Sequence, residues 1–155
     1  STSGRAFERA VKLCSVRPRT KKELRKFLRD KGYVKETIDE TMNKLAEYGF
    51  CDDARFCADY VAAYKSKNGV NKLRADLSRL GAEPAAIEAA LEEIDEQEEA
   101  AFAAAERYIR THPKFDMRKL KAHLYARGFD GSDISAAAAR VEEEYDFSDS
   151  DEIYD

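Results

Sequence analysis

The sequence predicts an all-α protein made of three tandem three-helix repeats, about nine helices in all. The main observation is a segment with two leucines four residues apart, a glycine four residues later and an isoleucine six residues after that. This segment begins at Leu24, Leu73 and Leu120, so its copies are offset by 49 and 47 residues. Repetition at such a period is typical of modules that stack into a solenoid. We therefore expect right-handed helices stacked into an elongated, curved, solenoid-like arc.

Composition supports helices and argues against strands. Charged residues make up 37% of the 155-residue chain, Trp is absent, and three Pro and seven Gly interrupt the sequence, a mixture typical of solvated helices. A repeat of about 47 residues cannot bury enough apolar surface to be stable alone, so the repeats must pack on each other. We place the first repeat at residues 1–50, the second at 51–97, the third at 98–142, and an acidic, disordered tail at 143–155.

In the first repeat, apolar residues at helical spacing predict three helices. The first carries a stripe formed by Phe7, Ala10, Leu13 and Cys14. Thr20 and Glu23 are placed to form a capping box at the start of the second helix, and Gly32 suits a left-handed end to that helix. The third helix is expected from about Lys35 to Tyr48.

The second and third repeats follow the same scheme. Asp52-Asp53 is placed to cap a helix whose inner face carries Phe56, Tyr60, Val61 and Tyr64. The next helix ends at Gly81, and Pro84 suits the first turn of the one after it. No Gly or Pro lies between Pro84 and Arg110, so the sequence predicts a nearly unbroken helix across the boundary between these repeats. His112-Pro113 ends that stretch, and two further helices follow.

Charge is distributed unevenly along the chain. Net charge is −4, but residues 1–50 carry 13 basic and 7 acidic side chains, whereas residues 96–155 carry 8 and 15. From Glu142 onward there are eight acidic residues and no basic one, which predicts a disordered or loosely docked extension. Such polarity can steer a charged partner and fix its orientation.

No residue pattern points to catalysis. The sequence has no phosphate-binding Gly-rich loop, no zinc-binding His-Glu-x2-His helix and no nucleophile elbow. His112 and His123 have no further ligand at metal spacing, and Cys14, Cys51 and Cys57 are best explained as small apolar side chains on buried helix faces. We therefore expect no catalytic, metal or cofactor site, and hence no enzyme.

The strongest local signal is basic. Nine Lys or Arg and two acidic residues lie between Arg17 and Lys35, and Lys22, Arg25, Lys26 and Arg29 cluster opposite Leu24, Phe27 and Leu28 on a helical wheel. This face is either a patch that binds phosphates or the acidic surface of a partner protein, or it is simply the solvated side of a helix. Weaker basic groups recur on the matching helices of the second and third repeats.

Arg-Pro-Arg-Thr-x2-Glu-Leu-Arg-x2-Leu-x2-Lys-Gly-Tyr, from Arg17 to Tyr33, together with the later Asp52-Asp53-x2-Phe56-x3-Tyr60-Val61, resembles the RecX family. The resemblance covers roughly residues 5–142. RecX proteins are bacterial regulators of the RecA recombinase. The resemblance implies a protein that binds in the groove of the RecA filament on single-stranded DNA and bridges neighbouring subunits. ATP turnover, filament extension, strand exchange and repressor co-cleavage would thereby be restrained.

The basic residues of the three repeats are the predicted contacts to the RecA filament or DNA. They are Arg17, Arg19, Lys21, Lys22, Arg25, Lys26, Arg29 and Lys31 in the first repeat, Lys72 and Arg74 in the second, and Arg118, Lys119, Lys121 and Arg127 in the third. A stand-alone helical module that binds single-stranded or duplex DNA is the alternative. We expect a monomeric cytoplasmic protein, because no apolar run is long enough to cross a bilayer and the first residues lack a signal peptide's apolar core.

Overall fold

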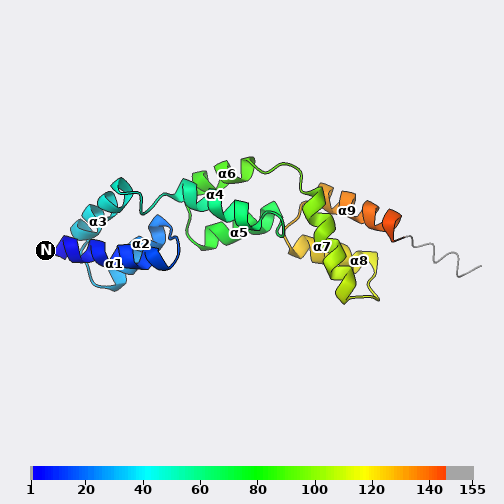
Figure 1. The fold of residues 1–155 in the computed structure, drawn as a ribbon, viewed down its shortest axis with the longest axis horizontal. Coiled ribbons are helices and arrows are strands. Elements are labelled where there is room, and N and C mark those ends of the chain that lie inside the picture. Colours follow the sequence, from blue (N-terminus) through cyan, green and yellow to red (C-terminus); the bar gives the residue numbers. More distant parts are fainter. Residues whose placement is uncertain (1, 146–155) are drawn as a thin grey trace, which may run out of the picture. The chain divides into compact units, whose positions relative to one another are not determined.

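The computed structural model describes residues 2–145, and this part of the chain is all α-helical (Figure 1). None of its helices is long and apolar enough to cross a membrane. The all-α prediction and the expected number of helices are confirmed for these residues. The nine helices are α1 (Thr2–Val16), α2 (Lys21–Asp30), α3 (Lys35–Glu47), α4 (Asp53–Tyr64), α5 (Val70–Arg79), α6 (Pro84–Glu92), α7 (Glu98–Thr111), α8 (Met117–Ala126) and α9 (Gly131–Glu144).

The ends of the helices follow the predicted capping chemistry. Thr20 accepts a hydrogen bond from the Glu23 amide at 3.1 Å, and the Glu23 carboxylate accepts one from the Thr20 amide at 2.9 Å, which completes the capping box of α2. Gly32 ends α2 with a φ of 90°. The following amide, that of Tyr33, donates back to the Leu28 carbonyl at 3.2 Å, as in a Schellman motif.

The same glycine-ended turn closes α5 and α8. Gly81 and Gly128 have φ values of 87° and 92°, in a region that only glycine enters without strain. Ala82 and Phe129, the residues that follow, donate to the carbonyls of Leu77 and Leu124 at 3.1 and 3.2 Å. The recurring glycine of the sequence therefore marks a recurring helix end.

The chain forms two compact units. Unit 1 comprises residues 1–62 and 76–90, and unit 2 comprises residues 63–75 and 91–155. The boundary between the units runs through α4, α5 and α6. The division into three sequence repeats remains a prediction about how the chain is organised.

Each unit has its own hydrophobic core, and the predicted apolar positions make up most of that of unit 1 but not the part of the unit 2 core that α7 contributes. In unit 1, α1 and α2 both pack on α3, and in unit 2, α7, α8 and α9 pack on one another. The buried cluster of unit 1 contains Ala6, Ala10, Leu24, Leu28, Ile38, Met42, Leu45 and Cys51. That of unit 2 contains Ala101, Phe102, Ala104, Ala105, Leu120, Leu124, Phe129, Ile134, Ala137 and Val141.

The predicted continuous helix from Pro84 to Arg110 is wrong. α6 ends at Glu92 and α7 begins at Glu98. The physical reason is Gln97, which is 6% exposed and whose side chain binds two carbonyls of the α4–α5 connection and the amide of Val70, the first residue of α5. These tertiary bonds hold the Gln97 backbone outside helical geometry, with φ −108° and ψ 29°, although nothing in the local sequence breaks the helix.

Three smaller predictions differ in part from the structure. Tyr64 is 43% exposed and does not belong to the inner face of α4, where Val61 is buried as expected together with Cys57. Cys51 is buried as expected, but it lies in the connection before α4 and not on a helix. The predicted tail from residue 143 begins within α9, which continues to Glu144, and residues 146–155 lie outside the described part of the chain.

Candidate partner-binding surface

The predicted basic patch lies on the solvent side of α2. Leu24 and Leu28 are fully buried beneath it, whereas Lys22, Lys26 and Arg29 are exposed. This separation follows from the helical period, which places residues three and four apart on one face. Of the other predicted cations in this region, Arg17 and Lys31 are exposed and Arg19, Lys21 and Arg25 are half-buried.

Four of these eight cations already have a carboxylate partner. Arg25 contacts Asp39 of α3 at 3.0 Å, and the hydrogen bonds from Lys35 and Arg25 hold the pKa of Asp39 below its ordinary value. Such pairs neutralise part of the patch, although exposed pairs stabilise the fold only slightly. The other three pairs join Arg17 to Glu23 at 2.7 Å, Lys21 to Glu83 at 3.8 Å, and Lys26 to Asp30 at 2.8 Å.

Three cations remain uncompensated on this side of unit 1. Lys22, Arg29 and Lys31 form no ion pair with any carboxylate of residues 2–145, and Lys31 lies over the ring of Phe27 at 5.6 Å. The methylene stem of Lys22 packs beside Gly81, where an added Cβ would lie 3.0 Å from it. Lys22 thus buries its stem while its ammonium group stays in solvent.

Arg19 differs from the other predicted cations. Its Nε is buried, and no hydrogen-bond partner for it lies within residues 2–145. The side chain lines a hollow together with Pro18, Phe50, Asp52 and Asp59. Arg19 therefore belongs to a crevice of mixed charge and not to the open face of α2.

In unit 2, the predicted cations lie on α8 and on the first part of α5. Arg118, Lys119 and Lys121 of α8 and Arg74 of α5 are exposed, and Arg74 also donates to Asn71 at 3.2 Å. Lys72 and Arg127 are half-buried. Arg127 donates to the Lys67 carbonyl at 3.1 Å, so it has a structural contact in addition to its charge.

The predicted patch of unit 1 adjoins a junction in which the start of α2 meets the end of α5. Asp53, which is 3% exposed, accepts hydrogen bonds from the backbone amides of Lys21 and Glu83, both at 3.0 Å. The Thr20 hydroxyl donates to the Leu80 carbonyl at 2.9 Å. The Asp53 carboxylate, at the start of α4, thus binds the starts of α2 and α6.

Unit 2 contains the corresponding junction between the start of α5 and the end of α8. The Gly69 amide donates to the Arg127 carbonyl at 2.8 Å, and the Asn71 amide donates to the Gly128 carbonyl at 3.0 Å. The two backbones are so close that a Cβ at Gly69 would lie 2.2 Å from the Gly128 carbonyl carbon. Gln97 accepts from the Val70 amide at 2.9 Å, as Asp53 accepts from Lys21 in unit 1.

Sequence reasoning missed the roles of Asp53, Gln97 and Gly69. The Asp52-Asp53 pair was expected to cap α4, and Asp52 does so by accepting from the Arg55 amide at 3.2 Å, whereas Asp53 accepts from amides outside its own helix. The signal available for Asp53 was the presence of two consecutive aspartates at the start of α4. Gln97 offered none, because its partners lie 27 to 32 residues away in the chain.

Similarity to known proteins identifies the family of this chain. The family model for the first three-helix domain of RecX matches residues 6–45. The regulatory protein RecX of Stenotrophomonas maltophilia is 35% identical over 136 residues, which cover 84% of this chain and 83% of that protein. The chain belongs to the RecX family. Its curated members carry the name regulatory protein.

Other RecX proteins differ in how much of their length this chain spans. The one from Prosthecochloris aestuarii is 28% identical over 138 residues, and the chain covers 91% of it. The one from Bacillus licheniformis is 31% identical over 150 residues, but the chain spans only 57% of its length. The crystal structure of RecX from Lactobacillus salivarius has the same fold, with a TM-score of 0.82 at 23% identity over 91% of this chain and 97% of that one.

Proposed function

We propose that this chain binds the RecA nucleoprotein filament on single-stranded DNA as a cytoplasmic monomer and restrains RecA. The activities affected would be ATP hydrolysis, filament extension, strand exchange and repressor co-cleavage, and DNA repair and recombination would be modulated as a result. Membership of the RecX family supports this proposal, since its curated members carry the name regulatory protein.

The observation that carries the proposal is the uncompensated charge beside α2. Lys22, Arg29 and Lys31 are exposed and have no carboxylate partner within residues 2–145. Cations of this kind are available to DNA phosphates or to acidic side chains of a filament, and they speed and orient association. The remaining predicted cations of α2, α5 and α8 belong to the same proposal as secondary contacts.

The decisive measurement is DNA-stimulated ATP hydrolysis by RecA, titrated with this protein at fixed single-stranded DNA and moderate salt. We expect inhibition at well below one protein per RecA subunit, because a bound protein that blocks extension affects many subunits. A ligand inhibits only through its preference for one filament state over others. Unchanged hydrolysis at saturating protein would overturn the proposal.

A pair of charge-matched variants tests the surface itself. The double variant K22E/R29E reverses two unpaired cations, and we expect it to weaken inhibition about tenfold or more through loss of charge-assisted contacts. Arg25 is left unchanged because a glutamate there would face Asp39. The control R110E/K114E makes the same change in net charge at two exposed positions outside the predicted surface. Equal loss in both variants would show that only net charge matters.

A stand-alone DNA-binding module is the second candidate, and the same unpaired cations favour it. Binding that depends on phosphate contacts releases counterions, so the affinity for bare single strands should fall steeply as salt is raised, with or without RecA. Fluorescence anisotropy with a labelled oligonucleotide at several salt concentrations measures this slope. Weak, salt-insensitive binding would leave only the RecA-dependent function.

A further inference from the structure

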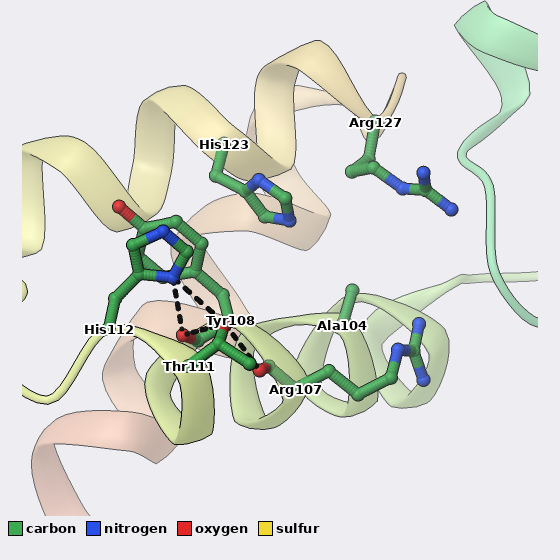
Figure 2. Close-up of a pocket in the computed structure, with 7 residues that line it drawn as sticks. All are labelled: Ala104, Arg107, Tyr108, Thr111, His112, His123 and Arg127. Carbon is green, nitrogen blue, oxygen red and sulfur yellow. Dashed lines mark hydrogen bonds between the residues drawn. The ribbon is translucent and has the colours of Figure 1, made fainter.

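A small pocket in unit 2 brings both histidines of the chain together with the ring of Tyr108. It has a volume of about 260 Å³ and lies between α7 and α8. Figure 2 shows His123 between the Tyr108–His112 pair and the two arginine side chains. The lining residues are Ala104, Arg107, Tyr108, Thr111, His112, His123 and Arg127.

Ring stacking holds the two imidazoles of the pocket in place. His112 stacks on Tyr108 with ring centroids 4.0 Å apart and an interplanar angle of 10°, and His123 lies on Tyr108 at 4.6 Å and 31°. The Nδ1 of His112 also lies 2.9 Å from the Tyr108 carbonyl oxygen. Because a carbonyl oxygen can only accept, Nδ1 carries the proton in this contact. Both rings are therefore positioned before any ligand arrives.

The charge of the pocket is positive and has no counter-charge in its wall. Arg107 and Arg127 line it, and no Asp or Glu is among the lining residues. Burial lowers the pKa of His123, and the nearby Arg127, His112 and Arg107 lower it further. The groups that lower the pKa of His123 therefore come from α7, which carries Arg107, and from the residues that follow α7 and α8, His112 and Arg127.

A purely structural explanation accounts for only part of this arrangement. Cations are favoured at the carboxyl end of a helix, where the last carbonyls carry partial negative charge, and His112 and Arg127 occupy such positions at α7 and α8. Arg107 precedes the last turn of α7, is exposed, and forms no ion pair with a carboxylate in the described part of the chain. Helix-end electrostatics therefore explain neither the position of Arg107 nor the lack of an Asp or Glu among the residues that line the pocket.

We propose that this pocket binds a phosphate group, supplied either by a nucleic-acid strand or by a free phosphate. Arg107 and Arg127 would contact the phosphate oxygens as planar, permanently charged donors, and the Thr111 hydroxyl and the imidazoles would complete the wall. The volume exceeds that of several water molecules, so a phosphate group fits with room to spare. The chemistry of the site does not require RecA, and only its nucleic-acid form overlaps with the DNA-binding alternative.

Histidine NMR signals of the whole chain report on this site directly. Inorganic phosphate would be titrated at constant ionic strength, with chloride as the replaced anion, while the ring Cε1–Hε1 signals of His112 and His123 are followed. We expect a saturable shift of both signals and a rise in the pKa of His123, because a bound anion favours its charged form. R107Q should weaken binding about tenfold. The control R110Q, exposed on the same helix and outside the pocket, should bind as the unchanged protein does.

The source of the phosphate is distinguished in a second arm. A short single-stranded oligonucleotide that produces the same histidine shifts, again weakened by R107Q, would assign the site to nucleic acid. Shifts with inorganic phosphate alone would assign it to a free phosphate. The absence of a saturable shift with either ligand, or equal weakening in R107Q and R110Q while both retain helical circular dichroism, would overturn the site. RecA inhibition is not a readout here, so this result and the proposed function stand or fall separately.

Discussion

At the scale of single residues, two buried polar side chains bind distant backbone amides, which could not be predicted from the local sequence. Asp53 accepts a hydrogen bond from the first backbone amide of α2, that of Lys21, and Gln97 accepts one from the first backbone amide of α5, that of Val70. Thr20 and Glu23 were predictable because a capping box is complete within four residues. The contact between Arg25 and Asp39 was not, because it requires α2 and α3 to be packed together.

Replacement of Asp53 by alanine tests the first of these contacts. D53A leaves the amides of Lys21 and Glu83 without their acceptor, and each unsatisfied buried group costs about 1–3 kcal/mol. We expect the free energy of unfolding, measured by urea denaturation, to fall by roughly 2–4 kcal/mol. The control D59A removes an exposed carboxylate of the same helix and should change it by less than about 0.5 kcal/mol. A similar loss in both variants would contradict the role of Asp53.

At the scale of elements, the helices and most of their ends could be predicted from the sequence, but the break between α6 and α7 could not. The apolar period located all nine helices of residues 2–145, and the recurring glycine located the ends of α2, α5 and α8. The break between α6 and α7 depends on Gln97 reaching the α4–α5 connection. Local propensity cannot report such a contact, because tertiary hydrogen bonds can override a favourable helical sequence.

The repeated glycines offer a matched test of the junction in unit 2. Gly32 and Gly128 occupy the same place in their repeats and have nearly the same φ, 90° and 92°. A Cβ at Gly32 would meet nothing within 4 Å, whereas one at Gly128 would lie 2.3 Å from the Lys72 amide nitrogen. G32A should therefore cost roughly 1–2 kcal/mol through backbone strain alone. G128A should cost about 1–3 kcal/mol more through overpacking. Equal thermal stabilities of the two variants would refute a close-packed junction.

At the scale of the whole molecule, the chain's compact units do not coincide with its sequence repeats. Residues 63–75 belong with the third repeat and residues 76–90 with the first, so α5 contributes to both units. The repeat pattern could not predict this division, because it records which residues are alike and not which ones pack together. The predicted basic surface was likewise correct about exposure for most of α2 but could not tell paired cations from unpaired ones.

Hydrogen exchange along α5 tests this division. Ile38 and Ile134 are equivalent buried residues in the cores of units 1 and 2, and shortening either to valine costs about 0.5–1.5 kcal/mol. I134V should accelerate exchange of the Leu73 amide more than that of Leu77, and I38V should do the reverse, because each half of α5 relies on a different core. Identical responses at both amides in both variants would indicate a single cooperative unit.

The contact between Gly69 and Gly128 has one further consequence. Its hydrogen bonds join main chain to main chain, so they do not depend on the exposed side chains of α8 and of the first part of α5 as long as both positions lack a Cβ. The exposed residues of α8 and of the first part of α5 can then be exchanged freely to recognise another partner without loosening the joint. Unit 2 can therefore change its exposed contact residues while the main-chain bonds of this junction are kept.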